Sequence, residues 1–186
     1  MGFLDQLSST RRFERAYAEH LVQRLHALPW PGALSELERE WIEPRGWYVA
    51  LAQGPRVLLT GAAGAGKTTA LADLALAHAG AMLAGAKTAR VPVFFAARDL
   101  ASSALPRITD LPRGLYLPEP LAAQCPRIYF PDLFASGRAL VLIDDIDTLP
   151  AEALQAWVKD FGNAQIVATA HAAAPGFIET RLSGFR

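Results

Sequence analysis

The chain has 186 residues, of which 52% are hydrophobic and 19% are charged, and this suits one folded domain with a sizeable core. Its 18 Lys and Arg residues balance 18 Asp and Glu residues, so net charge gives no general attraction to nucleic acid or membranes. The single cysteine, Cys125, excludes an intramolecular disulfide and a cysteine-based zinc site, and we expect a reducing, cytoplasmic location.

The first part of the chain predicts helices. Residues 9–28 form the longer one, and a short helix over 34–41 follows. Apolar residues of the longer helix recur at helical spacing: Phe13, Tyr17, Leu21 and Leu25. We expect this helix to pack on the rest of the protein, the alternative being a partner-binding element. The prediction is therefore a helical segment at 1–44 and an α/β domain at 45–186.

A glycine-rich loop follows the first predicted strand, residues 56–60. The loop is Gly61-Ala62-Ala63-Gly64-Ala65-Gly66-Lys67-Thr68, and it fits the phosphate-binding pattern G-x-x-x-x-G-K-[ST] at every fixed position. A helix is predicted from Thr69. Glycines let backbone N–H groups close on phosphate oxygens, and the helix N-terminus adds further donors. We expect residues 61–69 to bind a nucleotide, with Lys67 on the β- and γ-phosphates and the Thr68 hydroxyl on Mg²⁺.

The remaining elements alternate between strands and helices. Strands are predicted at 91–96, 139–143 and 165–169, and helices at 131–136 and 151–161. Pro92 suits the start of its strand or the edge of a sheet. Residues 99–126 contain five prolines and predict loops and short helices. This alternation predicts a parallel α/β sheet. A fifth strand is expected to begin within 182–186, which would make the chain a fragment of a longer protein. The most apolar stretch, 69–86, contains an acid and a histidine, so we expect no membrane partner.

Acidic and polar side chains follow the third and fourth strands. Asp144 ends the third strand, from which an acid can reach Mg²⁺ beside a phosphate loop, and we assign it to the metal. Asp145 and Asp147 follow, and a divalent cation relieves the repulsion among such carboxylates. Asp147 is our candidate for polarising an attacking water, with capping of the next helix as the alternative. Thr169 and His171 are candidates for contacting the γ-phosphate or that water, and a structural histidine is the alternative.

Together these residues resemble the NACHT family of signal-transducing NTPases, within the STAND class of P-loop ATPases. The similarity covers residues 45–186. Its most specific part is Gly137-Arg138-Ala139-Leu140-Val141-Leu142-Ile143-Asp144-Asp145-Ile146-Asp147-Thr148-Leu149-Pro150, where the family form is roughly G-R-A-L-L-L-L-D-G-L-D-E-L-P. Further similar segments are 57–71, 91–100, 166–171 and 182–185. The resemblance implies a three-layer P-loop NTPase core with a mostly parallel sheet, and the family's helical and winged-helix modules are absent.

The resemblance also implies a switch that binds ATP or ADP with Mg²⁺, hydrolyses ATP slowly and controls self-association and signalling, in bacteria within defence or regulation. Three residues depart from the family pattern. Asp145 replaces a small residue, Thr148 stands where Glu is common, and His171 stands where an arginine is expected. An imidazole is shorter than a guanidinium and only partly charged near neutral pH, so these departures bear on hydrolysis more than on binding.

Three other functions remain open from the sequence. An AAA+ type ATPase that remodels or loads protein or DNA shares the loop, the metal-binding Asp and the fourth strand, and Arg181 or Arg186 would be its arginine finger. A small-molecule kinase would need a basic lid, and the arginines of residues 99–127 are dispersed among prolines. The third is a nucleotide-binding module without hydrolysis. The choice between ATP and GTP is also open, although residues 47–51 are the expected base-binding segment.

Overall fold

The computed structural model describes residues 3–27, 54–98 and 117–182, with side chains from residue 8 onward. Its helices are α1 (Phe3–His26), α4 (Lys67–Leu83), α7 (Glu119–Gln124), α8 (Tyr129–Ala135), η2 (Ile146–Thr148) and α9 (Ala151–Asp160). Its strands are β1 (Arg56–Thr60), β2 (Val91–Ala96), β3 (Ala139–Asp144), β4 (Gln165–Ala170) and β5 (Ile178–Arg181). The helix predicted at 34–41 and the expected base-binding segment at 47–51 lie outside the described residues.

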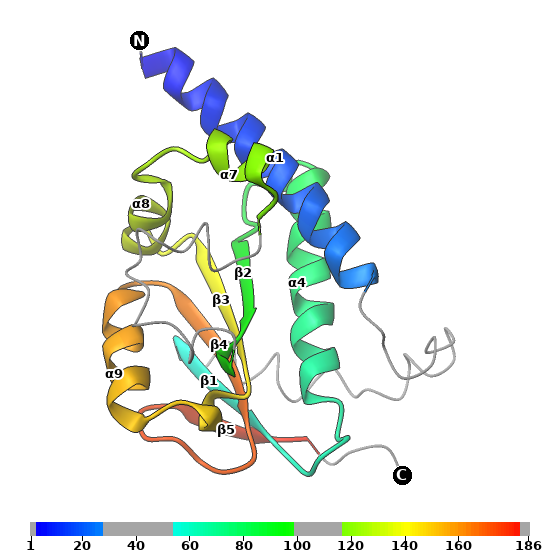
Figure 1. The fold of residues 1–186 in the computed structure, drawn as a ribbon, viewed down its shortest axis with the longest axis vertical. Coiled ribbons are helices and arrows are strands. Elements are labelled where there is room, and N and C mark those ends of the chain that lie inside the picture. Colours follow the sequence, from blue (N-terminus) through cyan, green and yellow to red (C-terminus); the bar gives the residue numbers. More distant parts are fainter. Residues whose placement is uncertain (1–2, 28–53, 99–116, 183–186) are drawn as a thin grey trace.

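The strands form one parallel sheet in the order β2-β3-β4-β1-β5. Helices α1 and α4 lie on one face, and α8 and α9 lie on the other (Figure 1). Every residue of β3 is buried, as are the last four residues of β1 and the last five of β4. Strands covered on both faces are apolar throughout, which is why the sequence pattern located them. The three-layer α/β fold is confirmed.

Helix α1 packs on the domain, as the sequence predicted. It begins at Phe3, six residues earlier than expected, and its apolar stripe is buried against α4. The Tyr17 hydroxyl donates to the carbonyl of Pro92 over 2.7 Å. Pro92 belongs to β2, which lies at one edge of the sheet, so the expectation of an edge position is confirmed. The tyrosine thus binds a backbone carbonyl of a strand that lies at the edge of the described sheet.

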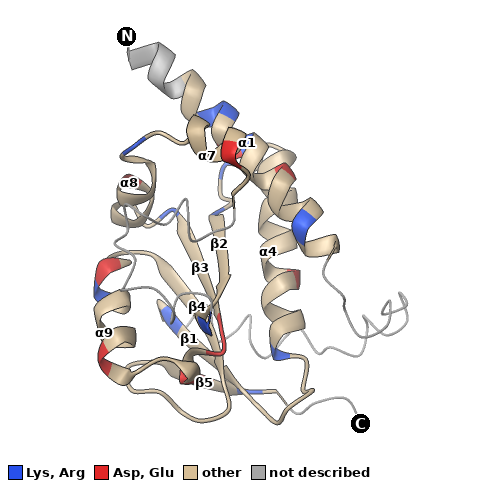
Figure 2. Cartoon of the chain, in the orientation of Figure 1, with Lys and Arg blue, Asp and Glu red and all other residues tan. Residues whose placement is uncertain are grey.

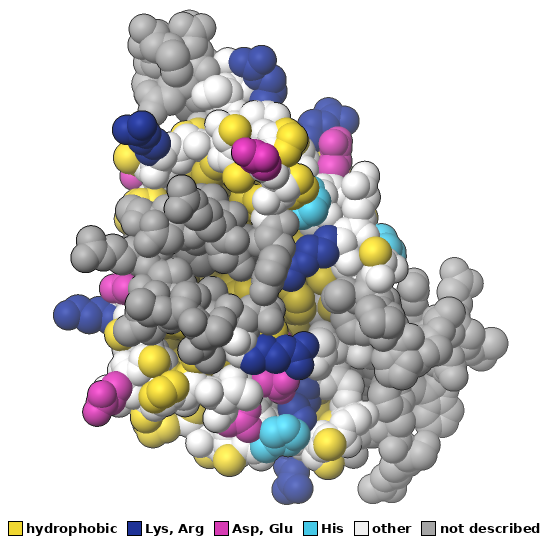
Figure 3. Space-filling model, viewed as in Figure 1, with side chains coloured by type: hydrophobic (Ala, Val, Ile, Leu, Met, Phe, Trp, Pro, Cys, Tyr) yellow, Lys and Arg dark blue, Asp and Glu magenta, His cyan; other side chains and the backbone are white. Residues whose placement is uncertain are grey.

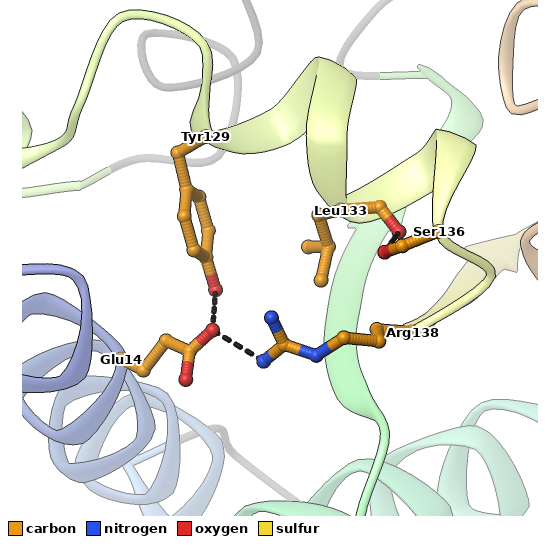
Figure 4. Close-up of polar contacts among 5 residues, drawn as sticks. All are labelled: Glu14, Tyr129, Leu133, Ser136 and Arg138. Carbon is orange, nitrogen blue, oxygen red and sulfur yellow. Dashed lines mark hydrogen bonds and ion pairs between the residues drawn. The ribbon is translucent and has the colours of Figure 1, made fainter. Parts of the chain in front are cut away.

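A second polar contact joins α1 to the opposite layer. One oxygen of Glu14 accepts hydrogen bonds from Tyr129 at the start of α8 (3.1 Å) and from Arg138 just before β3 (2.5 Å) (Figure 4). Burial, and then the neighbouring Glu14 carboxylate, raise the pKa of Tyr129, so its hydroxyl remains a donor. The ring of Phe13 meets Tyr129 edge-on. Glu14 therefore ties α1 to α8 and to the residue that leads into β3.

The position expected for the fifth strand was wrong. That strand is β5, Ile178–Arg181, and it ends before residue 182. It contains no apolar run, and three of its four residues are exposed. Among the strands that the structure describes, β5 lies at an edge and pairs with β1 alone. Within residues 3–27, 54–98 and 117–182, every helix is too short or too polar to cross a lipid bilayer.

Candidate nucleotide-binding site

The carboxyl ends of β1, β3 and β4 meet at one edge of the sheet, because the three strands are parallel neighbours. The glycine-rich loop leaves β1 there, and acidic residues gather at the end of β3 (Figure 2). In the space-filling view, acidic, basic and histidine side chains meet in the lower part of this face (Figure 3). The fold thus brings together the segments that the sequence singled out.

The loop between β1 and α4 uses glycine where its backbone requires it. Gly64 and Gly66 have φ angles of 75° and 83°, in the left-handed region that favours glycine. Gly61 is needed for another reason, since a Cβ there would lie 2.9 Å from the carbonyl oxygen of Leu182. That approach is too close for any other residue without movement of the chain. The glycine pattern therefore reflects both conformation and contact with the segment after β5.

Lys67 is the first residue of α4, and its side chain folds back over the loop. Its Nζ donates to the carbonyl oxygens of Gly61 (2.9 Å) and Ala62 (3.1 Å). The residue is only 7% exposed. A buried ammonium group needs acceptors, and the loop carbonyls supply them here. Phosphate oxygens are stronger acceptors for an ammonium group, so the position suits a lysine that binds phosphate.

Thr68 and Asp144 face each other across the edge of the sheet. The Thr68 hydroxyl lies 2.9 Å from Asp144 Oδ2 and 3.1 Å from Oδ1. A hydroxyl and a carboxylate are oxygen donors of the kind that Mg²⁺ prefers. In the part of the chain that the structure describes, no three His, Cys, Asp or Glu residues gather as a metal site. This pair therefore fits a Mg²⁺ that takes its other ligands from phosphate and water.

Thr169 lies at the centre of the polar contacts. It is fully buried, and its hydroxyl donates to Asp144 Oδ1 over 2.6 Å. The hydroxyl oxygen of Thr169 accepts the Asp145 N–H over 2.8 Å. The sequence suggested a contact with the γ-phosphate or the attacking water, whereas in this structure the hydroxyl serves Asp144 and the turn after it.

The turn after β3 has an unusual backbone. Asp145 has a φ of 55°, and no other described non-glycine residue has a positive φ. Its carbonyl accepts the Thr148 hydroxyl, which helps to hold the turn. Burial, and then the carboxylates of Asp144 and Asp147, raise the pKa of Asp145. The charges of Arg98 and His171 partly oppose that rise.

Asp147 and His171 are exposed and linked to each other. Asp147 Oδ2 accepts the backbone N–H of His171 over 3.0 Å, and the His171 side chain makes no described hydrogen bond. Asp147 does not cap α9, because Pro150 occupies the N-cap position without a side-chain bond. Both side chains therefore remain available to a ligand at the end of β4.

Two residues beside the site were not singled out from the sequence for this role. Arg98, just after β2, lies close enough to influence Asp145 electrostatically. Glu179 of β5 accepts the hydroxyl of Thr60 over 2.7 Å, directly before the glycine-rich loop. Only the parallel register, with Leu58 opposite Glu179, brings β5 there. No local sequence signal indicates such a pairing.

The Asp145 environment predicts a pH-dependent gain in stability on replacement. A carboxyl group with a raised native pKa disfavours folding once it ionises, so its cost is absent below its usual pKa of about 3.9 and grows as pH rises through the native pKa. Asp145→Asn should therefore raise the melting temperature at pH 7. Thermal unfolding across pH should show that gain shrinking in acid. A gain that is constant from pH 3 to pH 7 would contradict the electrostatic cause.

The match to a protein family agrees with this geometry. The family model described as the NACHT domain matches residues 55–184. No curated protein matches the chain. Among solved structures, AMPPCP-bound DnaA from Aquifex aeolicus is similar, with a TM-score of 0.41 and 16% identity. The alignment covers 86% of this chain and 49% of that one, so the chain spans about half the length of that structure.

Proposed function

The chain belongs to the NACHT domain family of P-loop NTPases, and we propose that it is an ATP-binding, slowly hydrolysing switch whose nucleotide state controls self-association and signalling. One observation carries the proposal. The buried Lys67 ammonium lies over the glycine-rich loop while Thr68 contacts Asp144. Together these supply a phosphate-binding cation and the two oxygen donors for a magnesium ion.

The position of each site residue suggests its role. Backbone N–H groups of residues 61–69 and Lys67 would hold the phosphates, and Thr68 and Asp144 would hold Mg²⁺. When bound, the ion would offset negative charge on the phosphates. Asp147 is exposed and carries the carboxylate that would orient an attacking water. His171 is adjacent, bound to Asp147 through its backbone, and its imidazole is the proposed γ-phosphate contact.

This arrangement suits a switch because its contacts depend on the nucleotide. The γ-phosphate of ATP adds contacts that ADP cannot make, so the two nucleotides favour different states of the protein. A water-orienting carboxylate at an exposed position, with histidine in place of arginine, favours slow turnover. Slow hydrolysis fits a reaction that resets a state.

The proposal predicts bound nucleotide and a state that depends on it. Protein purified without added nucleotide should release ADP on denaturation. Its sedimentation coefficient should then differ between ADP and a non-hydrolysable ATP analogue, each with Mg²⁺. Identical sedimentation in both would contradict the control of self-association, and absence of binding to either nucleotide would contradict the site itself.

His171→Ala should alter affinity for the analogue and leave ADP affinity within about twofold, since one hydrogen bond to a γ-phosphate is lost.

A further inference from the structure

Thr169 uses its hydroxyl entirely within the protein. A hydroxyl has one proton to donate, and that of Thr169 goes to Asp144 Oδ1. The oxygen accepts the Asp145 N–H, and none of the residue is exposed to solvent. Donation to a phosphate oxygen would require breaking the 2.6 Å contact with a buried carboxylate. We propose, on the basis of the function proposed above, that Thr169 is a positioning residue that orients Asp144 for Mg²⁺ and does not touch the nucleotide.

The Asp144 carboxylate depends on this contact for its orientation. It is 5% exposed and receives hydroxyl groups from two elements, Thr169 of β4 and Thr68 of α4. The Thr68 oxygen is itself a proposed metal ligand, so its own position changes with the metal. Thr169 is anchored in the middle of the sheet edge, between β1 and β3. Thr169 therefore holds the Asp144 carboxylate from a position that does not change with the metal. Hydrogen bonds that orient a metal ligand in this way affect metal affinity.

The same hydroxyl also holds the turn that follows Asp144. Asp145 adopts a left-handed conformation that is unfavourable for a residue with a Cβ, and its N–H points at Thr169. Without that acceptor the peptide unit between Asp144 and Asp145 loses its hydrogen bond to β4. One side chain thus fixes both ends of the metal-binding residue, its carboxylate and its peptide unit.

The experiment measures nucleotide affinity with and without metal. Thr169→Val keeps the shape of the side chain and removes the hydroxyl. Dissociation constants are measured for ADP and for a non-hydrolysable ATP analogue, with excess Mg²⁺ and with EDTA. In the variant we expect unchanged affinities in EDTA, and a gain from Mg²⁺ that is reduced by about 10- to 100-fold for both nucleotides. Thr169→Ser, which keeps the hydroxyl, should restore most of that gain.

A matched control separates positioning from a general loosening of the turn. Thr148→Val removes the other hydroxyl that bonds to this turn, at the Asp145 carbonyl, and it should leave the effect of Mg²⁺ intact. An equal loss in both valine variants overturns the proposal. So does a loss confined to the ATP analogue, which would show that Thr169 contacts the γ-phosphate.

Two further outcomes are distinguishable. A wild-type protein that binds neither nucleotide, or binds both without regard to Mg²⁺, overturns the proposed function and this role together. Should Thr169→Val fail to fold, Thr169→Ala replaces it, and the same reduced gain from Mg²⁺ is expected. A full Mg²⁺ effect in either folded variant overturns the positioning role alone.

Discussion

Lys67→Ala should abolish high-affinity nucleotide binding, because the phosphates lose their principal cationic partner. Lys67 Nζ donates two hydrogen bonds to loop carbonyls, and phosphate oxygens would accept such bonds in their place. Two charge-assisted hydrogen bonds of about 1.5–3 kcal/mol each correspond to a loss in affinity of roughly 100-fold or more. Isothermal titration with ADP and with an ATP analogue, in the presence of Mg²⁺, measures this loss.

Lys87→Ala is the matched control for charge. Lys87 is exposed in the loop between α4 and β2, at the far end of α4 from the glycine-rich loop. The variant has the same net charge as Lys67→Ala and should bind nucleotide like the wild-type protein. Affinity that falls equally in both variants would mean that general charge attraction, and not the loop lysine, governs binding.

Phe95→Ala should destabilise the fold far more than truncation of an exposed apolar side chain. Phe95 is fully buried in β2, and its ring lies 5.9 Å from Trp157 in α9 and 6.2 Å from Phe161 just beyond it. Removing a buried ring leaves a cavity, at a cost of about 3–5 kcal/mol. Urea denaturation followed by circular dichroism gives this loss directly, and the melting temperature should fall by roughly 10 °C.

Ile128→Ala is the control, because it truncates a large apolar side chain that is exposed and not buried. Ile128 is 53% exposed, just before α8, and surface truncations usually change stability by less than about 0.5 kcal/mol. A loss below about 1 kcal/mol for Phe95→Ala would show that the layer formed by α9 relaxes into the cavity, contrary to the tight packing of protein interiors.

Buried strands and the phosphate-binding loop were predictable from the sequence. The predicted bounds of β2 are those observed, and β3 and β4 each extend one residue further than predicted. Their apolar runs follow from burial on both faces of the sheet. The glycine-rich loop is equally local, because consecutive residues supply its turn, its lysine and its hydroxyl. Such patterns are predictable because each depends on the residues of one element alone.

The remaining features depend on pairs far apart in the chain. Strand β5 is mostly exposed and lies at the edge of the described sheet, so it lacks the apolar run that marks a buried strand. The contact of Thr169 with Asp144 and that of Glu14 with Arg138 join separate elements, and neither leaves a spacing signal. The sequence placed Thr169 at the site, but only the structure shows where its hydroxyl points.

The order of strands has a consequence for how the protein forms during synthesis. Strand β1 leads into the glycine-rich loop, yet its two neighbours are β4 and β5, the last strands of the described chain. Strand β1 is synthesised well before β4 and β5, so its apolar residues Val57, Leu58 and Leu59 lack these hydrogen-bonding neighbours until both strands have emerged from the ribosome. Pairings so distant in sequence slow folding and expose unpaired strands to aggregation. The glycine-rich loop therefore acquires the strands that flank β1 only after β4 and β5 have been synthesised.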